Sequence, residues 1–281
     1  MLGLAGGPPV VPGYRVGDEL GRGAMGVVYR AVQQSDGETV AIKTILPAIA
    51  PYPLVVGRFC REAEILGRFT HPNVVGHRAS GAAGPLLYVV MEYVPGEPGA
   101  AILDREGPLA PARVLHWAGR ILDALAHAHG SGFVHRDVKP GNMLVVAGAT
   151  GEVVKVSDFG LARAYESSGL SGLTTDGSAG GTPAIMPPEQ VTDFKRVKPA
   201  ADQYSAAATL YYLLTGSGVY EPTKSAGAML EQILYADPIP LRPGAPPLPG
   251  PFGPVVRRAL ARDPAARFPD VRAMRRALLD G

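Results

Sequence analysis

The run 135–142 carries the residues best suited to chemistry, and it reads His-Arg-Asp-Val-Lys-Pro-Gly-Asn. Asp137 offers a carboxylate that can orient a hydroxyl group and accept its proton, and Lys139 offers a cation for developing negative charge. Asn142 offers an amide oxygen for a metal ion. At the residue frequencies of this chain, these types at this spacing arise on the order of a few times per million chains. The run therefore predicts a site where a hydroxyl group reacts beside a metal ion.

Composition gives these residues further weight. The chain has 281 residues and 27 basic ones, of which only six are lysine, and the rest are arginine. Asparagine is scarcer still and occurs only at Asn73 and Asn142. A chain that nearly avoids both types makes each instance informative, so Lys139 and Asn142 point to chemistry more strongly than the same residues would elsewhere.

Two further positions suit phosphate and metal binding. Lys43 lies in the apolar run 40–43, where an ammonium group on a strand can neutralise nucleotide phosphates. The alternative is an ordinary surface lysine whose apolar stem lies along the protein. Asp158 opens the run 158–160, Asp-Phe-Gly, after the strand-like residues 153–156, which suits a metal ligand on a mobile segment.

A glycine-rich run, Gly-Arg-Gly-Ala-Met-Gly, occupies residues 21–26. Glycines let a backbone lie close over phosphates, where a Cβ would obstruct it. With 36 glycines in the chain, this pattern alone is weak. A dinucleotide-binding fold requires the run to open a helix, but here the strand-like residues 27–30 follow it. The run therefore predicts a hairpin folded over a nucleotide.

The elements that must position these residues fall into two groups. Residues 14–91 show short β-type runs interrupted by one helix near 55–69, with a hairpin turn at Asp36-Gly37. The expected strands are 14–20, 27–32, 39–46, 74–77 and 86–91. Helical periodicity then starts at Pro111 and continues in the windows 202–214, 228–235, 253–261 and 271–279. An α+β fold follows, with a small β-rich lobe and a larger, mostly helical one.

Composition also excludes several classes. A net charge of +2 gives no reason to expect a nucleic-acid or membrane-surface partner. The single cysteine, Cys60, excludes an intramolecular disulfide and a cysteine-based metal cluster, and it fits a reducing compartment. The apolar stretch 204–214 is about half the length of a membrane-spanning helix, and residues 1–13 form a Gly/Pro-rich tail without signal-peptide character. A cytoplasmic protein without a membrane segment is expected.

In this order and spacing, the glycine-rich run, the strand lysine, the His-Arg-Asp run and Asp-Phe-Gly resemble the eukaryotic-like protein Ser/Thr kinases found in bacteria. The resemblance covers residues 14–279 and implies a bilobal kinase domain over 14–280. Its N-lobe would be 14–91, its hinge 92–96 and its C-lobe 97–280. It implies a signalling enzyme that transfers the γ-phosphoryl group of ATP to Ser/Thr hydroxyls of proteins.

The resemblance assigns a role to each matching position. Asp137 would orient the substrate hydroxyl and Lys139 would stabilise the transferring phosphoryl group, while Asn142 and Asp158 would hold Mg²⁺, or Mn²⁺ in its place. Lys43 would contact the phosphates and pair with Glu62, for which Glu64 is the competing choice. The expected nucleotide contacts are Leu20, Gly21, Arg22, Gly23, Ala24, Met25, Gly26, Val27, Val28, Ala41, Lys43, Met91, Glu92, Val94 and Leu144.

The same resemblance makes residues 158–189 an activation loop. Thr174 and Thr175 are its favoured phosphorylation sites, and Arg136 would bind the phosphate and order the loop. Autophosphorylation and a transient self-association are therefore expected. The alternative is a flexible polar loop without a regulatory role, which its Ser and Gly residues also suit.

Three positions depart from the family pattern. Pro187-Pro188-Glu189 replaces Ala-Pro-Glu, and Glu189 is expected to pair with Arg267. Ile185 stands where the family usually has an aromatic residue. His77 stands where the family has an apolar residue in the spine that stacks against Phe159.

Two rival functions belong to other classes. The first is a pseudokinase scaffold, which His77 favours and which the intact Lys43, Asp137 and Asp158 oppose. The second is a small-molecule phosphotransferase of related fold. The glycine-rich run, Arg136 and the Thr-rich loop disfavour it.

Overall fold

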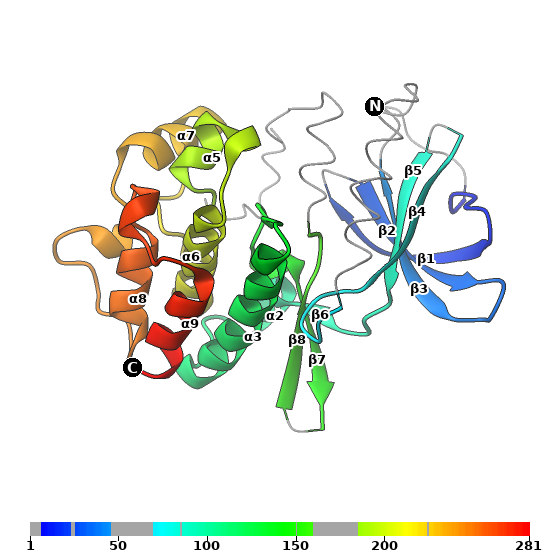
Figure 1. Cartoon of the computed structure of the whole chain (residues 1–281), viewed down its shortest axis with the longest axis horizontal. Coiled ribbons are helices and arrows are strands. Elements are labelled where there is room, and N and C mark those ends of the chain that lie inside the picture. The colour runs from blue at the N-terminus through cyan, green and yellow to red at the C-terminus, as the bar shows by residue number, and fades with distance from the viewer. Residues whose placement is uncertain are drawn as a thin grey trace. The chain divides into compact units, whose positions relative to one another are not determined.

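The computed structural model describes residues 7–23, 26–45, 70–84, 86–149, 151–159, 185–223 and 225–281 (Figure 1). The chain divides into two compact units. The first contains the described residues of 1–70 and 75–95, and the second contains those of 71–74, 96–162 and 175–281. The predicted helix at 55–69, with Cys60, Glu62 and Glu64, lies outside the described residues.

The first unit contains a five-stranded antiparallel sheet in the order β1-β2-β3-β5-β4. The strands are β1 (Tyr14–Gly23), β2 (Gly26–Gln33), β3 (Thr39–Ile45), β4 (His77–Ala83) and β5 (Leu86–Glu92). Side chains alternate between the two faces of each strand. One face buries a cluster of Val11, Ala31, Val40, Ile42 and Val90, so the other face is left to present Ala41 and Lys43.

Both predicted hairpins are present. β1 and β2 pair from Tyr14↔Gln33 to Gly23↔Gly26, so the glycine-rich run belongs to a hairpin and opens no helix. At the second turn, Gly37 has φ of 79°, a left-handed conformation that glycine adopts without a steric penalty.

The second unit is mostly helical and includes a small sheet in the order β6-β7-β8. Its strands are β6 (Glu97–Pro98), β7 (Met143–Gly148) and β8 (Gly151–Val156). The helices are α2 (Gly99–Glu106), α3 (Pro111–Gly130), α5 (Pro188–Thr192), α6 (Ala200–Thr215), α7 (Ala226–Tyr235), α8 (Phe252–Ala259) and α9 (Val271–Leu279). Figure 1 shows α3, α6, α8 and α9 packed side by side, with α3 also lying against β8.

Local sequence explains the two central helices. α3 starts with Pro111 at its first position, where the missing N–H costs nothing, and it buries an apolar stripe that includes Val114, Trp117 and Leu125. α6 is apolar over most of its length and is buried almost throughout. It ends at Gly216, whose φ of 68° closes the helix in a left-handed turn.

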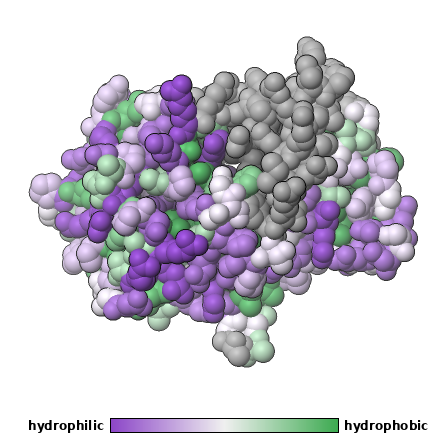
Figure 2. Space-filling view, viewed as in Figure 1, coloured by the Kyte–Doolittle hydropathy of each residue, from purple (hydrophilic) through white to green (hydrophobic). Residues whose placement is uncertain are grey.

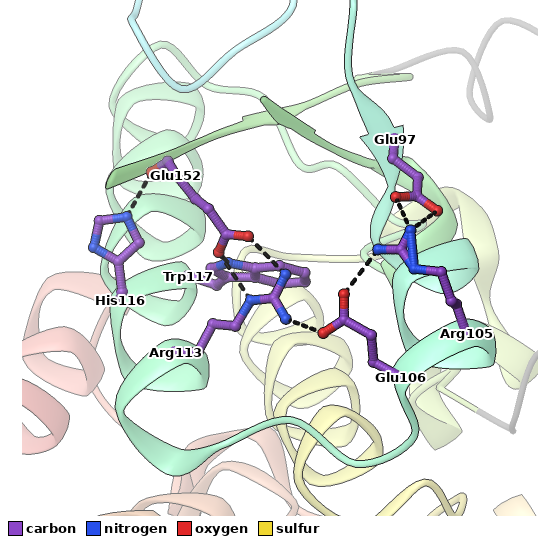
Figure 3. Close-up of polar contacts among 7 residues, drawn as sticks. All are labelled: Glu97, Arg105, Glu106, Arg113, His116, Trp117 and Glu152. Carbon is purple, nitrogen blue, oxygen red and sulfur yellow. Dashed lines mark hydrogen bonds and ion pairs between the residues drawn. The ribbon is translucent and has the colours of Figure 1, made fainter. Parts of the chain in front are cut away.

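A network of charged side chains joins β6, α2, α3 and β8 (Figure 3). Arg113 of α3 donates two hydrogen bonds to Glu152 of β8, at 3.0 and 2.6 Å, and a third to Glu106. Arg105 pairs with both Glu106 and Glu97. The network therefore links β6 and β8, the two edge strands of the small sheet, to α2 and α3.

Most predicted helices are confirmed, including the start at Pro111 and the windows in α6, α7, α8 and α9. The strand predicted at 74–77 is wrong, because β4 runs from His77 to Ala83 and Val74 forms only an isolated bridge with Val156. Small residues with low strand propensity fill β4, and its pairing with β5 creates it. The sequence also did not predict α2 or β7.

Polar residues predominate on the described part of the face in Figure 2, and apolar ones appear there only in small groups. Among the described helices, none is long and apolar enough to cross a membrane.

Candidate active site

In the first unit, the strand register gathers several predicted nucleotide contacts on one face. Val28 lies opposite Lys43, and Ala41 lies opposite Met91. Because directly opposed residues share a face, these four side chains project to the same side of the sheet. Lys43 is only 7% exposed, which is unusual for a lysine and fits a residue with a specific task.

The end of β5 is held by the segment before β4. The Glu92 N–H donates to the Gly76 carbonyl at 2.7 Å, and the Glu92 carboxylate accepts from the Gly76 N–H at 3.1 Å. Val94, two residues later, is buried. These contacts fix the course of the chain at the predicted adenine-binding residues.

The predicted glycine-loop contacts are only partly described. Leu20, Gly21, Arg22 and Gly23 are exposed on β1, while Gly26 and Val27 are buried on β2. Ala24 and Met25 lie outside the described residues.

In the second unit, the catalytic loop (residues 135–142) brings three predicted residues together. Lys139 Nζ lies 2.9 Å from Asp137 Oδ2, and Asn142 Nδ2 donates to the same oxygen at 2.9 Å. Asn142 Nδ2 also donates to the Asp137 carbonyl at 2.7 Å. Among the described residues, no donor reaches Asp137 Oδ1 or Asn142 Oδ1. One oxygen of each side chain can therefore meet a hydroxyl group or a metal ion.

The β7–β8 hairpin brings the fourth residue to this loop. Met143 pairs with Val156, so Asn142 and Ser157 are neighbours across the hairpin, and the Ser157 N–H donates to the Asn142 carbonyl at 2.9 Å. Asp158 follows directly and has φ of 62°, a conformation that is rare outside glycine and clusters at functional sites. Leu144, the predicted floor of the adenine site, is half-buried on β7.

The donor set fits a hard divalent cation. Asn142 offers an amide oxygen and Asp158 a carboxylate, and oxygen ligands of this kind suit Mg²⁺, Mn²⁺ or Ca²⁺. Among the described residues there is no group of three or more His, Cys, Asp or Glu arranged around a common point. Two protein ligands are typical of a metal that also binds substrate phosphates.

Helix α6 supports the catalytic loop through Asp202, which sequence reasoning missed. Asp202 is 0% exposed and accepts hydrogen bonds from the backbone N–H groups of His135 and Arg136, both at 2.8 Å. It also lies 2.7 Å from His129 Nε2. Burial by itself raises the pKa of Asp202, but the hydrogen bond and charge of His129, the charge of His135 and the Arg136 N–H hold it below its usual value. An aspartate at the start of the helical window 202–214, which is otherwise largely apolar, was the available signal.

The same face of α6 also binds two backbone carbonyl groups. The Thr209 hydroxyl donates to the Val138 carbonyl at 3.1 Å, and the Ser205 hydroxyl donates to the Ile185 carbonyl at 3.0 Å. Residues three and seven positions after Asp202 lie on its side of the helix. One helix face thus fixes both the catalytic loop and the last residues of the predicted activation loop.

His135 packs against the Asp-Phe-Gly run. Its ring centroid lies 4.4 Å from that of Phe159, and its Nε2 lies 2.9 Å from the Ser157 carbonyl. His77 is the first residue of β4, opposite Met91. The expectation that His77 weakens the stacking of the spine against Phe159 stays a prediction.

The predicted pair between Glu189 and Arg267 is confirmed. Arg267 donates to both carboxylate oxygens of Glu189, at 2.6 and 2.9 Å, and its side chain is 0% exposed. It also donates to the backbone carbonyls of Ala200, Ala261 and Arg262. Glu189 therefore keeps its structural role although Pro187 replaces the usual alanine. Residues 160–184 of the predicted activation loop, with Thr174 and Thr175, lie outside the described residues.

Comparison with known proteins identifies the class. The model of the protein kinase domain family matches residues 14–274. The chain belongs to this family, which confirms the resemblance and implies ATP and a divalent metal ion.

Individual relatives are bacterial. The chain is 37% identical to serine/threonine-protein kinase PkaA of Streptomyces coelicolor over 273 residues, which cover 92% of this chain and 48% of the relative. It is 34% identical to serine/threonine-protein kinase PknB of Mycobacterium tuberculosis over 270 residues, which cover 95% of this chain and 42% of the relative. This chain therefore spans less than half the length of these two relatives.

The fold also matches solved structures. A crystal structure of the Mycobacterium tuberculosis PknI kinase domain superposes with a TM-score of 0.70 at 27% identity, covering 97% of both chains. The predicted kinase fold is confirmed, with a five-stranded antiparallel sheet followed by a mostly helical region.

Proposed function

We propose that this chain is an active protein serine/threonine kinase that uses ATP with Mg²⁺. The observation that carries the proposal is that Lys139 and Asn142 both bind one carboxylate oxygen of Asp137. The register of β7 and β8 brings Asp158 to the same loop. The relatives named serine/threonine-protein kinases support a protein acceptor. A pseudokinase is disfavoured because these side chains are all present.

In the proposed reaction, Asp137 Oδ1 accepts a hydrogen bond from the Ser or Thr hydroxyl while Oδ2 stays bound to Lys139 and Asn142. The hydroxyl oxygen forms a bond to the γ-phosphorus, and the bond from that phosphorus to the β,γ-bridging oxygen breaks, so ADP leaves. The hydroxyl proton passes to Asp137. Lys139 lies close enough to Asp137 to stabilise negative charge on the group in transfer.

Asn142 and Asp158 would hold the metal ion, which neutralises charge on the phosphate oxygens when bound. On β3, Lys43 would contact the phosphates, and Glu62 is its proposed partner. The remaining nucleotide contacts are proposed as the sequence assigns them, with Val28, Ala41 and Leu144 around the adenine.

Regulation belongs to the same proposal. Autophosphorylation at Thr174 or Thr175, during a transient self-association, would give Arg136 a phosphate partner. We also propose a cytoplasmic location, because the chain contains a single cysteine.

The test uses purified protein, labelled ATP and a divalent ion, with casein as a generic protein acceptor. Wild type is expected to label casein and itself, and phosphosite mapping should find Ser or Thr only, including Thr174 or Thr175. Lys43→Met should abolish labelling. If wild type binds nucleotide but transfers no phosphate, the chain is a pseudokinase. If it phosphorylates only small molecules, it belongs with the small-molecule phosphotransferases.

A further inference from the structure

Arg136 of the catalytic loop is held in an unusual backbone conformation. It has φ of 70°, a left-handed conformation that non-glycine residues keep only where their surroundings hold them. Its N–H donates to Asp202 at 2.8 Å. Because Asp137 follows directly, the peptide between these two residues sets the direction in which the Asp137 side chain starts.

A second restraint on Arg136 comes from α5 and acts on the peptide between Arg136 and Asp137. Gln190 is 4% exposed, and its Nε2 donates to the Arg136 carbonyl at 2.8 Å. A carbonyl oxygen only accepts hydrogen bonds, so the amide nitrogen of Gln190 must be the atom that faces it. Of the two peptide groups that flank Arg136, one is therefore held by α6 and the other by α5.

The residues after α5 supply a third restraint. Phe194 follows α5 in a short 3₁₀ turn, Phe194–Arg196, and the Arg136 guanidinium carbon lies 5.3 Å from its ring centroid. A guanidinium group at this distance from an aromatic face is attracted to it. Both Gln190 and Phe194 belong to the stretch that directly follows the predicted activation loop.

α5 is itself firmly anchored. Glu189, next to Gln190, is bound at both oxygens by the fully buried Arg267. The Ile185 carbonyl, before α5, accepts from Ser205 at 3.0 Å. The Gln190 amide is thus presented to the catalytic loop from a backbone that is anchored just before it, at Ile185 and at Glu189.

We propose that Gln190 is a positioning residue for phosphoryl transfer. Its amide holds the peptide between Arg136 and Asp137, so the Asp137 carboxylate faces the acceptor hydroxyl only while α5 is in place. The inference rests on the proposed kinase function and extends it to a residue that makes no contact with Asp137 itself. Since Gln190 acts on the geometry of the transfer step, its loss should lower kcat and leave the KM for ATP unchanged.

The chain offers a matched control. Gln203 of α6 is also a buried glutamine bound to backbone, with Nε2 donating to the Phe268 carbonyl at 3.0 Å and Oε1 accepting from the Phe268 N–H at 3.1 Å. Gln203→Met removes two hydrogen bonds, neither of them to the catalytic loop, whereas Gln190→Met removes one, which is to the catalytic loop. A purely structural effect would therefore be larger in Gln203→Met.

Single-turnover transfer from labelled ATP to casein should fall about tenfold in Gln190→Met, the rate equivalent of one buried hydrogen bond. Its KM for ATP should stay within about twofold of wild type. Gln203→Met, assayed where it is fully folded, should keep the wild-type rate. A wild-type rate in Gln190→Met, or equal losses in the two variants, would overturn the proposal.

Hydrogen exchange gives a readout independent of activity. Amides of residues 133–142 should exchange faster in Gln190→Met than in wild type, and Gln203→Met should leave them unchanged. If wild type proves inactive, the proposed function fails, but this measurement still decides whether Gln190 holds the loop. Equal exchange in wild type and Gln190→Met would contradict that role.

Discussion

One buried carboxylate, that of Asp202, organises the start of the catalytic loop. An unpaired charge at 0% exposure would be strongly destabilising, but Asp202 accepts from two backbone N–H groups and lies against His129. Charge-assisted hydrogen bonds of this kind are among the strongest in proteins. The carboxylate therefore stabilises the fold and fixes the backbone that precedes Asp137.

Asp202→Asn should lower the free energy of unfolding at pH 7 by about 3 kcal/mol, because it weakens three hydrogen bonds to a charged group. The folded-state pKa of Asp202 lies below its ordinary value. Its contribution is therefore complete above the unfolded pKa of about 4 and is lost as the pH falls through the folded pKa. The gap between the free energies of unfolding of wild type and variant should narrow as the pH falls into the acid range.

Urea denaturation from pH 7 down to the acid limit of folding measures this gap. The exposed Asp104 provides a control, and Asp104→Asn should change the free energy of unfolding by less than about 0.5 kcal/mol. A gap that stays constant throughout the acid range would contradict the role given to the Asp202 charge.

At the scale of elements, the two halves of the network in Figure 3 differ in burial. The side chains of Arg113 and Glu152 are 26% and 30% exposed, whereas those of Arg105 and Glu97 are 56% and 38% exposed. Glu152 also accepts from the Trp117 indole N–H at 2.7 Å. Solvent screens the exposed pair far more, so the attachment of β8 to α3 should depend mainly on Glu152.

Glu152→Gln is expected to lower the free energy of unfolding by about 1–2 kcal/mol. The substitution removes the negative charge that accepts two hydrogen bonds from Arg113 and one from the Trp117 indole. Glu97→Gln should cost less than about 0.5 kcal/mol. The hydrogen bond from Arg113 leads the causes that hold the pKa of Glu152 below its usual value, so its contribution should also disappear as the pH falls below about 4. Equal losses for the two variants, measured by denaturation, would contradict this division.

The spacing of apolar residues predicts a helix or strand well where one face of that element is buried. It predicts a strand poorly where pairing with another strand determines that the element forms. α3 and α9 have clear apolar stripes, and the sequence places both. β4 consists largely of small residues, and β6 is two residues long, so partners distant in sequence decide them.

The same limit applies to the candidate site. Asp137, Lys139 and Asn142 meet because they are close in sequence, so their spacing reveals them. Asp202 and Gln190 act on residues more than 50 positions away. A single sequence carries no local pattern for such contacts, and only the packing of α5 and α6 shows them.

At the scale of the whole molecule, the family implies ATP and a divalent metal ion. A ligand that binds only the folded chain stabilises it, by about 2.7 kcal/mol at a concentration of 100 times its Kd. For a chain of this size, saturating ATP with a divalent ion should therefore raise Tm by about 5 °C or more. Chelation of the metal should remove most of this shift, and Asp158→Asn should show little metal dependence. An equal shift with and without the chelator would argue against Asp158 as a metal ligand.

The central claim is that Asp137 directs phosphoryl transfer, and single-turnover transfer from labelled ATP to casein tests it most directly. Asp137→Asn keeps the shape of the side chain but removes the group that accepts the hydroxyl proton. The variant should transfer phosphate at least about 100-fold more slowly than wild type, with the Kd for ATP within about twofold. A wild-type transfer rate in Asp137→Asn would contradict the claim.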